Sequence, residues 1–254
     1  MRDRPHIPSH QLLAPNFSCS SGGESSNLRS TFPSAASLTR GLGRVAPADI
    51  ETFVNTGTLR LHLGCFDQPT KGWINTDITP HLWIARVPGL AALLYKGGKI
   101  SHRRFEQHKA GIFNQVSYLD VTKRFSYRDG TFDAVFSSHL LEHLYRDQAE
   151  ACVGEIFRIL KPGGICRLVV PDLDKIVADY NPEHPELCLK KIFECDRRSK
   201  NVHHWHYSSK SLSNLLKGRG FSDVCQCAYR QGRCPDLELL DNRADESLFV
   251  EAIK

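Results

Sequence analysis

Three residues that could bind a ligand each stand at the end of a short apolar run: Gly64, Asp77 and Asp120. In open parallel sheets ligands bind at the carboxyl ends of the strands, so the residues just after each run matter most. A glycine there lets the backbone approach a ligand closely or adopt a positive φ. A carboxylate there can accept hydrogen bonds from both hydroxyls of a ribose, and a second carboxylate can bind the amino group of an adenine ring. Together the three residues predict a site for a nucleoside.

The turn after the first apolar run indicates whether the nucleoside ligand has a pyrophosphate group. The run 59–63 is followed by Gly-Cys-Phe-Asp rather than by G-x-G-x-x-G. The backbone cradle that holds a pyrophosphate is therefore missing, which argues against a nicotinamide enzyme. We expect a nucleoside ligand without a pyrophosphate.

Histidines near two of the predicted helices offer proton acceptors. Histidine suits general base catalysis because its unperturbed pKa is near neutrality. His139 follows the fourth apolar run, and Glu142 and His143 come soon after it, at the expected beginning of the next helix. His203 and His206 lie in the stretch 203–207 with a third histidine between them.

The histidines of 203–207, with Cys225, Cys227 or Cys234, also suggest a structural metal. Zinc sites usually pair ligands at C-x₂₋₄-C or H-x₃₋₅-H spacing. Cys225 and Cys227 are separated by one residue and alternate as in a buried strand. We therefore predict no metal site.

The elements that must position these residues are short strands alternating with helices. Alternating or continuous apolar runs predict strands over 59–63, 73–77, 116–119, 132–136, 166–170 and 247–253. Apolar positions at spacings of three and four predict a helix over 149–160, stopped by Lys-Pro-Gly-Gly at 161–164. Ser208 or Ser209 is expected to cap a further helix that ends at Gly218. This order is typical of an α/β fold with a mostly parallel sheet covered on both faces.

Composition agrees with one α/β domain and a modest tail. The chain has 254 residues, of which 41% are hydrophobic and 24% charged, as in an ordinary soluble protein. The apolar stretch 90–95 is far shorter than the roughly 20 residues of a membrane span. A net charge of +5 is too mild to indicate nucleic acid by itself. Nine cysteines, an odd number, indicate reduced thiols and a cytoplasmic protein.

The first 48 residues differ from the rest. They are rich in Ser, Pro and Arg, poor in acids and without periodicity, so we expect a disordered tail over 1–48 and a folded domain over 49–254. This composition also suits an organelle transit peptide, or an extension without a function. A second basic stretch, 96–128, is interpreted as a solvated insertion; RNA binding is possible there but not favoured.

Across 59–253 the sequence resembles the class I S-adenosylmethionine-dependent methyltransferases, and within them the type 11 group. The matching stretches occur in family order: LHLGC at 61–65, GWINTD at 72–77, Asp120 with DGTFDAV at 129–135, HLLEHL at 139–144, EIFRILKPGG at 155–164 and ESLFVEA at 246–252. Each stretch is weak alone, and their joint order is specific.

The resemblance implies a doubly wound, Rossmann-like sheet of seven strands with an antiparallel last strand, which binds S-adenosylmethionine. It implies that Gly64 and Cys65 lie beneath the methionine part and that Asp77 binds the ribose. Leu119 and Asp120 would contact the adenine.

The same resemblance assigns the remaining site residues. Ser138 and His139 would line the floor near the sulfonium, and His206 or His203 would face the acceptor as a base. Phe66 departs from the family pattern, because it fills the second glycine position of the turn. If that position requires a left-handed conformation, a bulky residue costs about 1–2 kcal/mol.

These observations predict an S-adenosylmethionine-dependent methyltransferase that acts on a small-molecule or sugar-linked acceptor. Two alternatives remain at this point. Phe66 favours a catalytically degraded binding protein with the same fold, and the basic stretch 96–128 favours an RNA methyltransferase.

Overall fold

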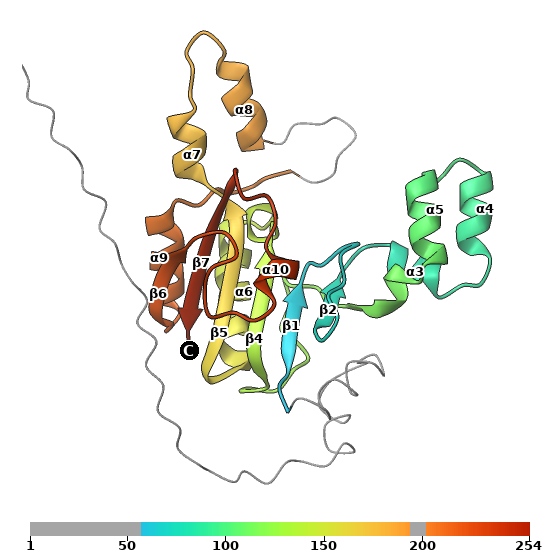
Figure 1. Ribbon diagram of the computed structural model, residues 1–254, viewed down its shortest axis with the longest axis horizontal. Helices are drawn as coiled ribbons and strands as arrows, with labels where there is room; N and C mark the ends of the chain where they lie inside the picture. The colour runs from blue at the N-terminus through green and yellow to red at the C-terminus, as the bar shows by residue number, and fades with distance from the viewer. Residues whose placement is uncertain (1–56, 194–201) are drawn as a thin grey trace, which may run out of the picture. The chain divides into compact units, whose positions relative to one another are not determined.

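The computed structural model describes residues 57–193 and 202–254. These residues contain a seven-stranded sheet in the order β3-β2-β1-β4-β5-β7-β6 (Figure 1). The strands are β1 (Arg60–Leu63), β2 (Ile74–Asp77), β3 (Val116–Tyr118), β4 (Phe132–Ser138), β5 (Leu160–Pro171), β6 (Ser222–Cys227) and β7 (Ser247–Ile253). Neighbours among β1 to β5 pair in parallel, whereas β7 is antiparallel to β5 and β6. The predicted fold class is confirmed.

Helices occupy four of the connections between strands. Three helices and a 3₁₀ turn join β2 to β3: α3 (His81–Ala85), α4 (Leu90–Lys96), α5 (His102–Lys109) and η1 (Ile112–Gln115). The 3₁₀ turn η2 (Leu141–His143) and α6 (Arg146–Ile159) join β4 to β5. Between β5 and β6 the described residues form α7 (Leu173–Ala178), α8 (Pro185–Phe193) and α9 (Ser209–Gly218). Between β6 and β7 they form α10 (Leu237–Leu240).

The helix α6 shows how the apolar pattern builds the core. Its predicted inward positions Ala149, Cys152, Val153 and Ile156 are fully buried in the main hydrophobic cluster, together with side chains of β1, β4 and β5. Helix α9 is capped as expected, because the Ser208 hydroxyl accepts a hydrogen bond from the backbone N–H of Ser211 at 3.2 Å.

One predicted boundary is wrong. The Lys-Pro-Gly-Gly stretch at 161–164 was expected to form the stop after the helix, with a strand beginning at Cys166. Instead α6 ends at Ile159 and β5 begins at Leu160. The stretch lies inside an irregular part of β5, opposite a register shift between Phe132 and Ala134. Helix-breaking residues also suit an irregular strand, so the local pattern did not distinguish the two.

A buried ion network fixes β7 and the segment before it to β5. Arg167 of β5 is fully buried and pairs with Asp241 and with Glu251 of β7. Its guanidinium also donates to the backbone carbonyls of Gln231, at 3.0 Å, and Ala228, at 3.2 Å. With several partners on each charged group, the network satisfies charges that would otherwise be costly to bury.

Among the described residues, no helix is long and apolar enough to cross a membrane. The predicted tail 1–48 and the expected domain start at residue 49 lie outside the described residues.

Candidate functional site

The strand register brings three predicted site residues to one edge of the sheet. Leu63, the last residue of β1, pairs with Thr76 of β2 and with Ser137 of β4. The next residues along each chain segment are Gly64, Asp77 and Ser138. They therefore lie at the carboxyl ends of three adjacent parallel strands, where such sheets bind ligands.

The third strand extends this edge. Asp77 pairs with Tyr118 of β3, and the backbone N–H of Leu119 donates to the carbonyl of Asp77 at 3.2 Å. Leu119 is buried in the main core. Asp120 follows it, so five of the residues predicted to bind the cofactor lie along one continuous edge: Gly64, Cys65, Asp77, Leu119 and Asp120.

The turn after β1 has the conformation expected of a close backbone approach. Gly64 has a φ of +68°, and a Cβ built there would lie 3.1 Å from the Leu140 side chain. Phe66 has a φ of +48°, so the left-handed conformation is required where the family pattern has a second glycine. Cys65 is buried, which raises the pKa of its thiol well above the ordinary range and keeps it neutral.

Asp77 holds this turn in place through both of its carboxylate oxygens. Oδ2 accepts a hydrogen bond from the backbone N–H of Phe66 at 3.0 Å, and Oδ1 accepts one from Thr79 at 2.6 Å. Burial raises the pKa of Asp77, while these hydrogen bonds act in the opposite direction. Each carboxylate oxygen retains a second lone pair, so the side chain can still accept hydroxyl hydrogen bonds.

Asp120 is held by its own turn. Its Oδ1 accepts hydrogen bonds from the N–H and the hydroxyl of Thr122, at 3.1 and 2.6 Å. Its Oδ2 pairs with Lys123 at 2.9 Å. The Thr122 and Lys123 hydrogen bonds hold the pKa of Asp120 below its ordinary value, so it is a carboxylate at neutral pH.

At the end of β4, Ser138 and the following residue His139 make hydrogen bonds to the segment around β7. The Ser138 hydroxyl lies 3.1 Å from Oδ1 of Asn242. His139 has a φ of +50°, and both ring nitrogens have partners: Nδ1 lies 3.1 Å from Oε1 of Glu142, and Nε2 lies 2.9 Å from the hydroxyl of Ser247. Because both nitrogens are engaged, His139 is suited to shape the floor rather than to accept a proton.

The two histidines predicted to face the acceptor lie beside each other, and one of them, His203, lies near Glu142. The rings of His203 and His206 are in contact, with centroids 5.0 Å apart. His203 is also one of a group with Glu142 and His143 whose potential ligand atoms lie within 4.8 Å of one another. Tyr207, next in the chain, forms a bridge with Asp172 directly after β5. The stretch 203–207 therefore reaches the same end of the sheet.

The structure corrects the expected placement of Glu142 and His143. They were predicted to begin the next helix, with the carboxylate at its positive end. Instead they belong to η2, and α6 begins at Arg146. Glu142 is fully buried, and its backbone carbonyl accepts the N–H groups of His204 and Trp205 at 2.7 and 3.2 Å. It anchors the 203–205 segment.

Sequence reasoning missed the contact between the insertion and the Gly64 turn. Arg104 of α5 hydrogen bonds to Asp67 and lies over the Phe66 ring, 4.4 Å from its centroid. Gln107 donates to the same Asp67 oxygen at 2.8 Å. Burial opposes ionisation of Asp67, but the Gln107 and Arg104 hydrogen bonds hold its pKa below the ordinary value. No local sequence pattern predicts that Asp67 pairs with residues of α5, because the two segments are far apart in the chain.

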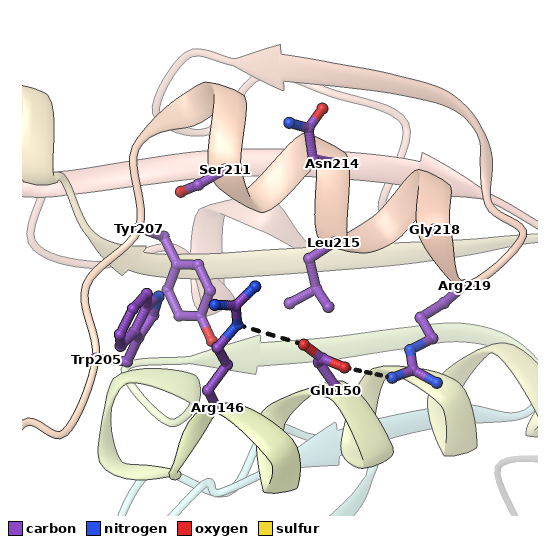
Figure 2. A pocket seen from close by; sticks show the side chains of 9 residues that line it. All are labelled: Arg146, Glu150, Trp205, Tyr207, Ser211, Asn214, Leu215, Gly218 and Arg219. Carbon is purple, nitrogen blue, oxygen red and sulfur yellow. Dashed lines mark hydrogen bonds and ion pairs between the residues drawn. The ribbon is translucent and has the colours of Figure 1, made fainter.

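A separate cavity of about 410 Å³ lies between α6 and α9 (Figure 2). Figure 2 shows Glu150 between two arginines, Arg146 and Arg219, with ion-pair distances of 3.4 and 2.8 Å. Trp205 and Tyr207 close one end. None of the predicted site residues lines this cavity, so we do not assign it to the reaction.

Comparisons with known proteins agree with this geometry. The sequence model of a family described as "Methyltransferase domain" matches residues 98–168, which include Leu119, Asp120, Ser138 and His139. The chain is 26% identical over 155 residues to a ubiquinone/menaquinone biosynthesis C-methyltransferase, UbiE, of Desulfotalea psychrophila, covering 53% of this chain and 62% of the relative. It is 26% identical over 135 residues to an uncharacterized methyltransferase of Synechocystis sp., covering 53% of this chain and 58% of the relative. The chain thus spans about three fifths of the length of these curated relatives.

Among solved structures, an S-adenosylmethionine-dependent methyltransferase from Archaeoglobus fulgidus is 16% identical with a TM-score of 0.46, covering 87% of this chain and 92% of that chain. The matched domain, the curated relatives and the sheet topology agree with the resemblance seen in the sequence. The matched domain and the curated relatives support a methyltransferase domain of the type 11 group over residues 98–168.

Proposed function

We propose that this protein transfers a methyl group from S-adenosylmethionine to a small-molecule or sugar-linked acceptor. The observation that carries the proposal is the single edge of the sheet that presents Gly64, Asp77, Asp120 and Ser138 from four parallel strands. S-adenosylmethionine, the cofactor of this class, supplies an electrophilic methyl group on a sulfonium when bound.

The residues at this edge fit that cofactor. The left-handed Gly64 turn, where a Cβ would lie 3.1 Å from the Leu140 side chain, keeps the chain compact at the end of β1. Asp77 has lone pairs left for the two ribose hydroxyls, and Asp120 is an ionised acceptor at the expected place of the adenine amino group. The protein's main task is to hold the reactants in near-attack geometry, which can supply roughly 7–11 kcal/mol of the barrier.

His206 is the best-placed base for a hydroxyl or amine acceptor. Its Nε2–H donates to the backbone carbonyl of Ile192 at 2.6 Å, which fixes the tautomer and leaves Nδ1 as the basic nitrogen. Nδ1 is buried and has no hydrogen-bond partner among the described residues. We propose that this atom accepts the acceptor's proton and that the neighbouring His203 ring orients it.

The class of acceptor is proposed from the curated relatives. The Desulfotalea psychrophila protein is named for ubiquinone and menaquinone biosynthesis, whose products are small molecules. In the described insertion, Arg104, a basic residue of the stretch considered for RNA, is engaged with Asp67 and the Phe66 ring. Arg104 is therefore one basic side chain of that stretch that already has partners within the protein.

Two measurements test the proposal. Calorimetric titration of the purified full chain with S-adenosylhomocysteine should show saturable binding, and ligand at 100 times Kd should add about 2.7 kcal/mol to the free energy of unfolding. Methyl-tritiated S-adenosylmethionine, incubated with the protein and an RNA-free, low-molecular-mass cell extract, should label compounds in that extract.

The outcomes separate the alternatives. Absence of binding at millimolar S-adenosylhomocysteine would favour the degraded binding protein, and label recovered only in added RNA would favour an RNA methyltransferase. With binding established, His206→Gln should lower kcat by roughly 10²–10⁴-fold, the usual contribution of a positioned base, and leave the affinity for S-adenosylhomocysteine unchanged. An unchanged kcat would remove His206 from the mechanism.

A further inference from the structure

A second group of side chains gathers next to the proposed acceptor side. Glu142 and His143 come from η2, and His203 comes from the segment before α9. One potential ligand atom from each lies within 4.8 Å of the other two. The His143 and His203 rings are in edge-to-face contact, with centroids 5.0 Å apart. A carboxylate and two imidazoles from different segments thus converge on one point.

The carboxylate of Glu142 provides a second, independent observation that points to a bound ion. Its side chain has no solvent exposure, and Oε1 contacts Nδ1 of His139 at 3.1 Å. Oε2 is buried and has no hydrogen-bond partner among the described residues. A buried carboxylate oxygen without a partner is costly and calls for an explanation such as a bound ion. A cation between Glu142 and the two imidazoles would provide it.

The His143 ring is oriented as in a metal-binding histidine. Ligating histidines usually donate their other ring N–H to a carbonyl or carboxylate, which fixes the tautomer. Nδ1 of His143 lies 3.2 Å from the carbonyl oxygen of Val202, which leaves Nε2 available as a ligand. The Glu142 carboxylate is likewise oriented by His139 through Oε1. Two of the three proposed ligands, His143 and Glu142, therefore each have a hydrogen-bond partner that orients the side chain.

We propose that Glu142, His143 and His203 bind a divalent metal ion of the zinc type. Two histidines and a glutamate form an established set of three protein ligands for zinc, which leaves a fourth position open. Zinc–ligand distances of about 2.0–2.2 Å require the three atoms to move closer together. His143 and His203 are only partly buried, so their side chains can rotate and an ion can reach the site from solvent.

Zinc binding can be measured without any methyl transfer, although His203 also contacts the proposed base His206. Metal binding would join η2 to the segment before α9, which already meet through the hydrogen bonds to the Glu142 carbonyl. It would also hold His203 against the His206 ring. The structural prediction is a stabilised 203–206 segment in the presence of zinc.

Zinc binding by the full-length protein tests the inference directly. After exhaustive removal of metal with a chelator, zinc is titrated against a competing indicator dye, and the zinc retained after dialysis is measured by mass spectrometry. We expect about one zinc ion per chain, with affinity at least tenfold lower in His143→Gln and in His203→Gln. His184→Gln is the matched control, because His184 is an exposed histidine outside the group. Its affinity should equal that of the wild type.

Nine cysteines make binding by thiolates the main competing explanation. Cobalt substitution in the wild-type protein distinguishes the proposed histidine and carboxylate site from a thiolate site without any variant. Histidine and carboxylate ligands give visible d–d bands without a thiolate-to-cobalt charge-transfer band. Folded protein that retains no zinc, equal affinity in His143→Gln, His203→Gln and the wild type, or a dominant thiolate charge-transfer band would each overturn the proposal.

Discussion

At the scale of single residues, Asp77 combines two tasks. The sequence resemblance assigns it to the ribose. The structure shows that its carboxylate also accepts hydrogen bonds from the N–H groups of Phe66 and Thr79. Removing it would leave two backbone donors without their partners; the Thr79 N–H is partly buried, and an unsatisfied buried donor costs about 1–3 kcal/mol. Binding and local structure are therefore coupled at this residue.

The informative substitution at this position is Asp77→Asn. Its amide oxygen can keep one backbone hydrogen bond, but its NH₂ group cannot accept from Phe66 or from a ribose hydroxyl. We expect affinity for S-adenosylhomocysteine to fall at least tenfold and the free energy of unfolding to fall by about 1–2 kcal/mol. Calorimetry and urea denaturation measure the two. Full affinity in a folded Asp77→Asn protein would show that the ribose contact lies elsewhere.

Phe66 combines an unfavourable backbone with a favourable ring contact. Its φ of +48° is strained for a bulky residue, whereas Arg104 lies over the ring at 4.4 Å. A pair of variants separates the two effects, because Phe66→Ala removes the ring and keeps the strain, while Phe66→Gly removes both. We expect Phe66→Gly to have a free energy of unfolding about 1–2 kcal/mol higher than Phe66→Ala by urea denaturation. Equal stabilities would mean that the turn relaxes to a negative φ once the ring is gone.

At the scale of elements, the strands were the most predictable part. The residues of β1 and β7 alternate or run apolar because one or both faces are buried, and that pattern is local. The contacts of α5 could not be predicted in this way. Asp67 and Arg104 meet only because the insertion folds back on the Gly64 turn, and neither residue carries a local signal of the other. That Gly64, Asp77 and Asp120 share one edge of the sheet was predictable for a related reason, since strand order places the ends of successive strands together.

The helix α5 supplies the element-scale prediction. Arg104→Met should loosen α5 from the Gly64 turn, because Asp67, with only 6% of its side chain exposed, loses a charged hydrogen-bond partner. We expect faster hydrogen exchange in 102–109 and a several-fold loss of affinity for S-adenosylhomocysteine, since a hydrogen bond to a charged group contributes about 1.5–3 kcal/mol.

Arg103→Met is the matched control on the same helix. Arg103 also faces Asp67, at 3.3 Å, but 75% of its side chain is exposed, so its contribution should be small. If the two variants exchange at the same rate, the contact with Asp67 does not hold the insertion in place.

At the scale of the whole molecule, the sheet divides into two halves with different tasks. The order β3-β2-β1-β4 brings the proposed cofactor residues together, and the reversal of strand order between β1 and β4 is where such sheets bind ligands. On the other side, β5 and β7 carry the Arg167 network, which fixes the segment from Ala228 to Asp241. His62 of β1 lies in the first half, and its titration makes the stability of the fold depend on pH.

His62 predicts how the stability of the whole fold responds to acid. It is buried beside the Phe136 ring, with centroids 5.1 Å apart, and burial lowers its pKa from 6.5 to about 4, although a hydrogen bond with Asn75 acts in the opposite direction. In the unfolded chain the imidazole titrates near 6.5. Between these values the unfolded state binds a proton that the folded state does not, so stability falls as the pH is lowered from 6.5 towards 4.

The shift corresponds to a few kcal/mol, at about 1.4 kcal/mol for each pH unit. His62→Leu removes this titration and keeps an apolar side chain of similar size against Phe136. Urea denaturation of both proteins at two pH values measures the effect. One value, pH 7.5, is about one unit above the pKa of the unfolded chain, and the other, about pH 4.5, lies between the two pKa values. We expect the wild type to lose about 2–3 kcal/mol more than His62→Leu over that range. Other groups titrate equally in both proteins and cancel in the comparison. Equal losses would mean that the buried imidazole is protonated in the folded state, which requires a partner for Nδ1 that the described residues do not supply.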